Sequence, residues 1–108
     1  MKSVEIIMLA VADKQQAKDF YLKLGFELVI EAPDAHGQTW LQMGLPGTNT
    51  TISLADFQGI IYETADIEAE ISELKGKGID VGPINKTPWG QFAWLKDLDG
   101  NQLCLHQH

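Results

Sequence analysis

Three side chains offer acid–base or nucleophilic chemistry. His106 and Glu63 can form a general acid–base pair if the strands that carry them lie side by side, because imidazole and carboxylate groups transfer protons. Cys104 is the only cysteine of the chain. A cysteine attacks as its thiolate, whereas a buried lone cysteine behaves as a small apolar side chain, and we favour that second interpretation. The catalytic candidates are therefore His106 and Glu63.

The other histidines and the aspartates near turns favour structural roles. His36 lies among Pro, Asp and Gly residues and His108 is the last residue of the sequence, so no rigid element holds either of them as a metal ligand. Asp13 and Asp66 stand where helix N-caps are expected, and the aspartates of 97–100 belong to a turn. We expect no metal ion and no other cofactor.

The elements that position these residues occur twice in the chain. A shift of 53 positions aligns Asp13 with Asp66 and Gly25 with Gly78 without a gap. The other aligned identities are Ile7 with Ile60, Ala12 with Ala65, Gly37 with Gly90, Gln38 with Gln91, Leu45 with Leu98, and Gly47 with Gly100. The chain is therefore one module used twice.

Each copy predicts a strand, a helix and three short strands. Asp13 caps the first helix and Gly25 ends it, while Asp66 caps the second. The expected apolar helix faces are Ala17, Phe20, Tyr21 and Leu24 in the first copy, and Ile67, Ile71 and Leu74 in the second. The expected strands are 4–11, 26–31, 38–43, 49–55, 60–64, 79–84, 91–96 and 102–107. This order predicts an α+β fold of two tandem βαβββ modules, 1–56 and 57–108, within a single domain.

Two strings carry a resemblance to a known family. VADKQQAKDFYLKLGFEL resembles the first-module signature of the vicinal-oxygen-chelate superfamily, the glyoxalase/bleomycin resistance protein/dioxygenase group. PWGQFAWLKDLDGNQLCLHQ resembles the closing motif of that family. The similarity covers nearly the whole chain. It implies a cupped eight-stranded mixed sheet with the helices on its convex face, and often a homodimer.

In metal-dependent members, such as glyoxalase I and the extradiol dioxygenases, side chains on the first and last strands of each module bind a divalent ion. The matching positions in this chain, called the four inherited positions below, are Ile6, Thr51, Gly59 and Cys104. Isoleucine and glycine offer no donor atom, and the other two replace Glu, His or Gln by a hydroxyl and a thiol. We expect these positions to bind no ion.

Strand alternation predicts which side chains line the cup when the four inherited positions face inward. Phe92 and Trp94 supply aromatic walls if the closing hairpin pairs regularly with Cys104. The alternative is ordinary packing of these two rings in the core or a dimer interface. The predicted ligand-binding residues are Met8, Thr51, Ser53, Ile61, Glu63, Phe92, Trp94, Gln102, Cys104 and His106.

The charge balance restricts the partners. Fifteen acidic residues against eight basic ones give a formal net charge of −7, which repels nucleic acid and suits a cationic small molecule, while the aromatic residues predicted in the cup suit an aromatic one. No stretch is long and apolar enough to cross a membrane, and a short chain with open sheet edges gains stability by pairing. We expect a cytoplasmic homodimer that binds a small-molecule ligand.

Two functions stay open at this point. The missing ligands favour a small-molecule binding protein similar to the metal-free, bleomycin-resistance-like branch of the family. The alternative is an enzyme of the glyoxalase, lyase, isomerase or dioxygenase kind that uses His106 and Glu63 without the inherited metal site.

Overall fold

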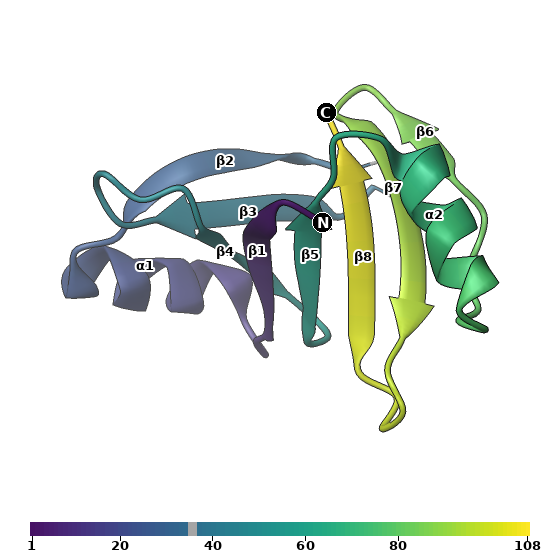
Figure 1. Ribbon diagram of the computed structural model, residues 1–108. Helices are drawn as coiled ribbons and strands as arrows, with labels where there is room; N and C mark the ends of the chain where they lie inside the picture. Colours follow the sequence, from purple (N-terminus) through teal and green to yellow (C-terminus); the bar gives the residue numbers. More distant parts are fainter. Residues whose placement is uncertain (35–36) are drawn as a thin grey trace. The chain divides into compact units, whose positions relative to one another are not determined.

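The computed structural model describes residues 1–34 and 37–108 of the chain (Figure 1). The predicted turn position of His36 lies outside the described residues. Within the described part, eight strands and two helices follow one another in two βαβββ repeats. Their bounds are β1 Ser3–Ala10, α1 Lys14–Leu24, β2 Glu27–Pro33, β3 Thr39–Gly44, β4 Thr51–Ala55, β5 Gly59–Glu63, α2 Ile67–Gly76, β6 Asn85–Thr87, β7 Gly90–Lys96 and β8 Gln102–Gln107.

The chain forms two compact units that correspond closely to the repeat. The first-module unit is Ile6–Gln58, and the second-module unit is Gly59–His108 together with Met1–Glu5. In the first-module unit, β1 pairs with β4 in parallel, and β3 pairs with β4 and β2 antiparallel. In the second-module unit, β5 pairs with β8 in parallel, and β7 pairs with β8 and β6 antiparallel. The predicted α+β class with two tandem βαβββ modules and mixed strands is confirmed.

The predicted helix caps are confirmed. The Asp13 carboxylate accepts hydrogen bonds from the backbone N–H groups of Gln15 and Gln16, both at 3.0 Å. The Asp66 carboxylate accepts one from the Ala69 N–H at 3.1 Å. These bonds satisfy donors that the first turn of a helix otherwise leaves unpaired. Both aspartates are therefore structural.

The closing hairpin turn is also built by an aspartate. The Asp97 carboxylate accepts hydrogen bonds from the Asn101 side chain at 2.8 Å and from the backbone N–H groups of Asn101 and Asp99, both at 2.9 Å. Because all of these bonds favour the charged form, with Asn101 contributing most, the pKa of Asp97 lies below its ordinary value. The hairpin therefore sets the register of β7 against β8.

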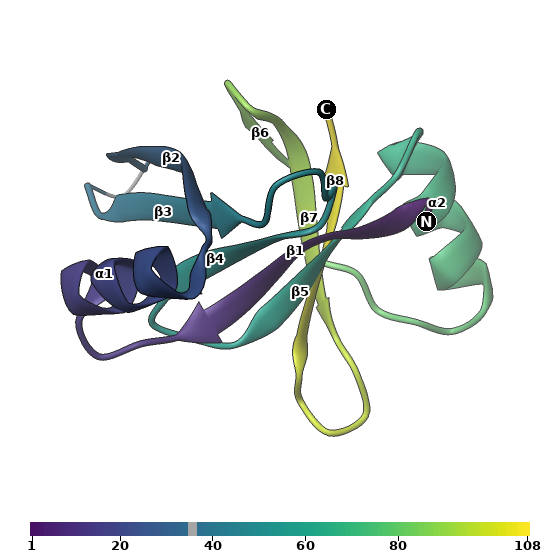
Figure 2. The same ribbon diagram turned by 90° about the vertical axis from the view of Figure 1, so that its left-hand side faces the viewer.

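The apolar core of the first-module unit lies between α1 and the sheet (Figure 2). Ala17 and Tyr21 pack against a cluster of fully buried residues, namely Leu41, Met43 and Leu54. Phe20 and Leu24, predicted on the same helix face, are each 57% exposed. The prediction was wrong for these two, because the helix meets the sheet along a stripe centred on Ala17 and Tyr21.

In the second-module unit, the predicted helix face is confirmed. Ile67, Ile71 and Leu74 are buried against Ala93 of β7 and Leu105 of β8. Figure 1 shows α2 lying alongside these two strands. This packing anchors β8, the strand that carries Cys104 and His106.

The prediction of a strand at 79–84 is wrong. These residues have no regular structure, and the strand that pairs with β7 is the shorter β6, Asn85–Thr87. Gly82 still donates a backbone hydrogen bond to the Trp94 carbonyl at 2.8 Å. Pro83 follows it and has no N–H, so regular pairing cannot continue through this segment.

Candidate functional site

The side chains at the four inherited positions do not fit a divalent ion. Ile6 is buried and apolar, and Gly59 has no side chain. The Thr51 hydroxyl accepts a hydrogen bond from the Gln42 amide at 2.7 Å. Burial raises the pKa of the Cys104 thiol to about 12, so the thiolate that a metal prefers is not formed near neutral pH. No chemical step is therefore assigned to a metal ion at these positions.

The raised pKa of Cys104 predicts a loss of stability in alkali. Its pKa rises from the ordinary value of 9.0 to about 12 in the folded chain, so the unfolded chain loses the thiol proton first. The contribution of the protonated thiol to the free energy of unfolding is complete below pH 9. Above pH 9 this contribution falls by about 1.4 kcal/mol per pH unit. Urea unfolding of the wild type and Cys104→Ala between pH 7 and about pH 11 measures the difference. Parallel curves for the two proteins would contradict a protonated, buried thiol.

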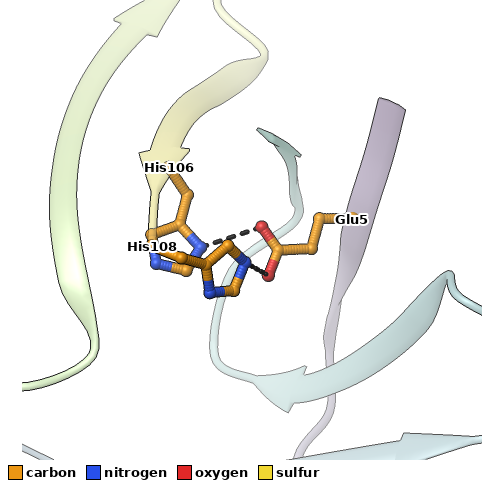
Figure 3. A group of neighbouring side chains, drawn as sticks. All are labelled: Glu5, His106 and His108. Atoms are coloured by element: carbon orange, nitrogen blue, oxygen red, sulfur yellow. Dashed lines mark hydrogen bonds and ion pairs between the residues drawn. The ribbon is translucent and has the colours of Figure 1, made fainter. Parts of the chain in front are cut away.

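A second group of polar side chains gathers in the second-module unit. Glu5 of β1 contacts both His106 of β8 and His108, which follows that strand (Figure 3). His106 Nδ1 lies 2.8 Å from Glu5 Oε1, and His108 Nε2 lies 3.0 Å from Glu5 Oε2. The side chains of His106 and Glu5 are 5% and 15% exposed, and that of His108 is 60% exposed. One carboxylate therefore bridges a buried and an exposed imidazole.

His106 is held from three directions. Its Nε2 lies 2.9 Å from the carbonyl oxygen of Trp89, and the Phe92 ring stacks on it with centroids 4.1 Å apart and planes 4° apart. A carbonyl oxygen only accepts, so Nε2 must carry a proton and donate it. The opposite nitrogen, Nδ1, then faces the carboxylate of Glu5. A lone pair aimed at a carboxylate is repelled, so this contact is favourable only with a proton or another cation on Nδ1.

The predicted catalytic pair, His106 and Glu63, occupies directly paired positions of β8 and β5. The ring of His106 bonds to Glu5, whereas the Glu63 carboxylate lies 3.8 Å from Lys2 Nζ and 3.9 Å from His108 Nε2. The structure therefore brings Glu63 to the edge of the same cluster, with His108 between the two carboxylates. The catalytic roles of His106 and Glu63 stay predictions.

The predicted ligand-binding residues fall into both units and differ in burial. Three of them, Met8, Thr51 and Ser53, belong to the first-module unit, and the others belong to the second-module unit. Five are buried: Met8, Ser53, Ile61, Cys104 and His106. The half-buried ones are Thr51, Glu63, Phe92, Trp94 and Gln102.

The aromatic residues of β7 lie where the hairpin prediction put them. Phe92 is paired with His106 and Trp94 with Cys104 in the β7–β8 register. Directly paired residues of neighbouring strands project to the same side of a sheet. The two aromatic rings and His106 therefore belong to one face of the second-module unit.

Two other features of the described residues bear on ligand binding. The Ser53 hydroxyl is buried and has no hydrogen-bond partner within the described part of the chain. A shallow hollow of about 360 Å³ in the second-module unit contains none of the ten predicted ligand-binding residues. It is lined by Glu68, Ile71, Ser72, Lys75, Gly82, Pro83 and Ile84. Neither feature supports chemistry by itself.

Sequence reasoning missed Glu5 and the carbonyl of Trp89. Glu5 is the only charged side chain between Val4 and Val11, and a carboxylate within an otherwise apolar strand was the available signal. Trp89 contributes a backbone atom, whose position depends on how 88–90 leads into β7. No property of the Trp89 side chain reveals that contact.

The family is established by comparison with known proteins. The family model described as Glyoxalase/Bleomycin resistance protein/Dioxygenase superfamily matches residues 3–105. The chain belongs to this superfamily. The resemblance stated for the two sequence strings is thereby confirmed.

Proteins that are similar to this chain have different descriptions. The uncharacterized protein YwkD of Bacillus subtilis (strain 168) is 25% identical, with 97% of this chain and 94% of that protein covered. The crystal structure of methylmalonyl-CoA epimerase from Mycobacterium tuberculosis matches with a TM-score of 0.85 and 19% identity, covering 96% of this chain and 86% of that one. This match shows a shared fold. TnmS3, an antibiotic binding protein from Streptomyces sp. CB03234, is 32% identical over 99% of this chain and 96% of its own, with a TM-score of 0.48.

No helix in the described part of the chain could cross a membrane. Neither α1 nor α2 reaches the length and apolar character that a membrane-spanning helix requires.

Proposed function

We propose that this superfamily member binds a small molecule through the Phe92 and Trp94 face of the second-module unit, without using an ion at the four inherited positions. The observation that carries the proposal is the chemistry of those positions. Two of them have no donor atom, and the Cys104 thiol stays protonated near neutral pH. Reactions that depend on a Lewis acid at this place have no support in these residues.

The half-buried residues on this face suit a flat ligand. Phe92 and Trp94 offer aromatic surface, and Glu63 and Gln102 add polar groups on the neighbouring strands. Apolar walls with a few placed polar groups are typical of small-molecule sites. The Glu63 carboxylate and the net charge of −7 favour a ligand that carries a positive charge.

The oligomeric state and location expected from the sequence remain part of this proposal. Large apolar side chains of α1 and β2 are exposed, among them Phe20, Leu24, Leu28 and Val29. Exposed apolar groups of this size favour a protein partner. This exposure supports the homodimer expected from the sequence, and the cytoplasmic location stays an expectation from the sequence alone.

A thermal-shift panel of aromatic cations and neutral aromatic compounds tests the proposed function. A ligand that binds the folded chain raises its unfolding temperature. We expect Phe92→Ala and Trp94→Ala each to weaken the affinity for a binding compound by about tenfold or more, because each removes an aromatic wall. Phe20→Ala is the matched control, since Phe20 is exposed on α1 of the other unit.

Two results would reject the proposal. Equal affinities in Phe92→Ala, Trp94→Ala and Phe20→Ala would place the ligand elsewhere. Turnover of a bound compound that is lost in Glu63→Gln while binding persists would favour the alternative, an enzyme that uses His106 and Glu63.

A further inference from the structure

We propose that Glu5, His106 and His108 together bind one divalent transition-metal ion, at a place distinct from the four inherited positions. Two imidazoles and one carboxylate form a donor set that suits zinc and its first-row neighbours. All three residues belong to the second-module unit and come from β1, β8 and the residue after β8. The inference goes beyond the proposed ligand binding and does not depend on it.

The separations between the ligand atoms fit a shared ion. The carboxylate oxygens of Glu5 lie 2.8 Å from His106 Nδ1 and 3.0 Å from His108 Nε2. One ligand atom from each of the three residues lies within 4.8 Å of the others. Two ligand atoms at about 2.0 Å from a tetrahedral zinc ion lie roughly 3.3 Å apart. Small rotations of the side chains would therefore bring the three ligand atoms to the separations that such an ion requires. Figure 3 shows a nitrogen of each ring turned toward the Glu5 carboxylate.

The surroundings of His106 orient its ring so that Nδ1 can bind an ion. Because Nε2 donates to the Trp89 carbonyl at 2.9 Å, Nδ1 is the ring nitrogen that can offer a lone pair to an ion. Histidine ligands commonly donate their second ring N–H in this way, which fixes the tautomer and the ring plane. The stacked Phe92 ring restrains the same plane. A divalent ion at Nδ1 would also contact the Glu5 carboxylate, which faces this nitrogen at 2.8 Å.

The local charge favours a cation. The carboxylates of Glu5 and Glu63 lie 3.0 and 3.9 Å from His108 Nε2. Among the ion pairs of the described residues, the one lysine that contacts either carboxylate is Lys2, whose Nζ lies 3.8 Å from Glu63. Two carboxylates against one ammonium leave a net negative charge around the imidazoles. His108 is 60% exposed, so an ion has access from solvent.

The site differs from the inherited one in every ligand. Glu5 precedes Ile6 on β1, and successive side chains of a strand point to opposite faces. His106 lies two positions beyond Cys104 on β8. The sequence led us to expect no replacement site, because His108 follows the last strand, yet its ring lies at hydrogen-bonding distance from Glu5.

Calorimetric titration with Zn²⁺ and Co²⁺ tests the proposal. The protein carries no polyhistidine tag and is first treated with a chelator. We expect one ion per chain for the wild type. Glu5→Gln and His108→Gln should each weaken binding at least tenfold, since each removes one of three ligands. His108 is exposed, so His108→Gln should fold normally. Visible absorption of bound Co²⁺ should appear in the wild type and fade in both variants.

Glu73→Gln is the matched control, because Glu73 is an exposed carboxylate of α2 that pairs with Lys77 at 3.5 Å. It should bind both ions as the wild type does. The proposal is overturned if the wild type shows no saturable binding of one ion, or if Glu5→Gln and His108→Gln bind as tightly as Glu73→Gln. Small-molecule binding that persists in chelator and is lost in Phe92→Ala would show that ligand binding does not require the metal ion. Failure of the metal proposal would then leave the proposed function standing.

Discussion

Replacing Gly90 by alanine is expected to lower the free energy of unfolding by about 3 kcal/mol or more. An added Cβ would lie 2.2 Å from the carbonyl oxygen of Gln107 and 2.9 Å from His106 Nε2. Gly90 also has a φ of 124°, a conformation that side chains disfavour. Relief of the clash requires β7 to move from β8, which changes the setting of His106. Urea unfolding of the variant and the wild type measures the loss.

Gly100→Ala separates the two causes. Gly100 has a φ of 83°, but a Cβ there would meet no atom of the described residues within 4 Å. Only the backbone conformation is then unfavourable, and the expected loss is about 1 kcal/mol. Similar losses in Gly90→Ala and Gly100→Ala would show that the close approach of Gly90 to β8 has no energetic consequence.

The parts of the fold predicted correctly depend on local sequence. Asp13 and Asp66 are separated by the repeat spacing and each accepts backbone N–H groups at a helix start. Ile67, Ile71 and Leu74 recur at helical spacing and are all buried. Capping and periodicity act over a few residues, so a single sequence contains the information that determines them.

The parts predicted wrongly depend on tertiary packing. The segment 79–84 has enough apolar residues for a strand, but Pro83 removes a donor and the pairing starts later, at Asn85. Phe20 has the spacing of a core residue and is nevertheless exposed. How far a helix face extends into the core depends on the elements beneath it, which helical periodicity alone does not show.

The candidate site was predictable only in part. His106 was identified from its strand position, and the β5–β8 register places it beside Glu63. Its hydrogen-bond partners, however, are Glu5, which is 101 residues away along the chain, and a backbone carbonyl. Alternation assigns a strand residue to a face but does not identify the long-range partner of a flexible side chain. The contact between Glu5 and His106 therefore required the structure.

The two histidines on Glu5 are expected to differ sharply in their contribution to stability. His106→Ala should lower the free energy of unfolding by about 3 kcal/mol, because it removes a buried ring and leaves one oxygen of the Glu5 carboxylate and the Trp89 carbonyl without the contact that His106 makes. The lost contacts are those to Glu5 at 2.8 Å, to the Trp89 carbonyl at 2.9 Å and to the stacked ring of Phe92. Urea unfolding in the presence of a chelator measures the effect without bound metal.

His108→Ala is the matched control for this prediction. His108 contacts the same carboxylate at 3.0 Å, but its side chain is 60% exposed and water replaces it on removal. The expected loss is below about 1 kcal/mol. A double-mutant cycle between His106→Ala and Glu5→Gln should give a coupling energy of about 1 kcal/mol or more, since the two groups are in direct contact. Equal losses for the two histidines, or no coupling to Glu5, would mean that the buried contact does not hold β8 to β1.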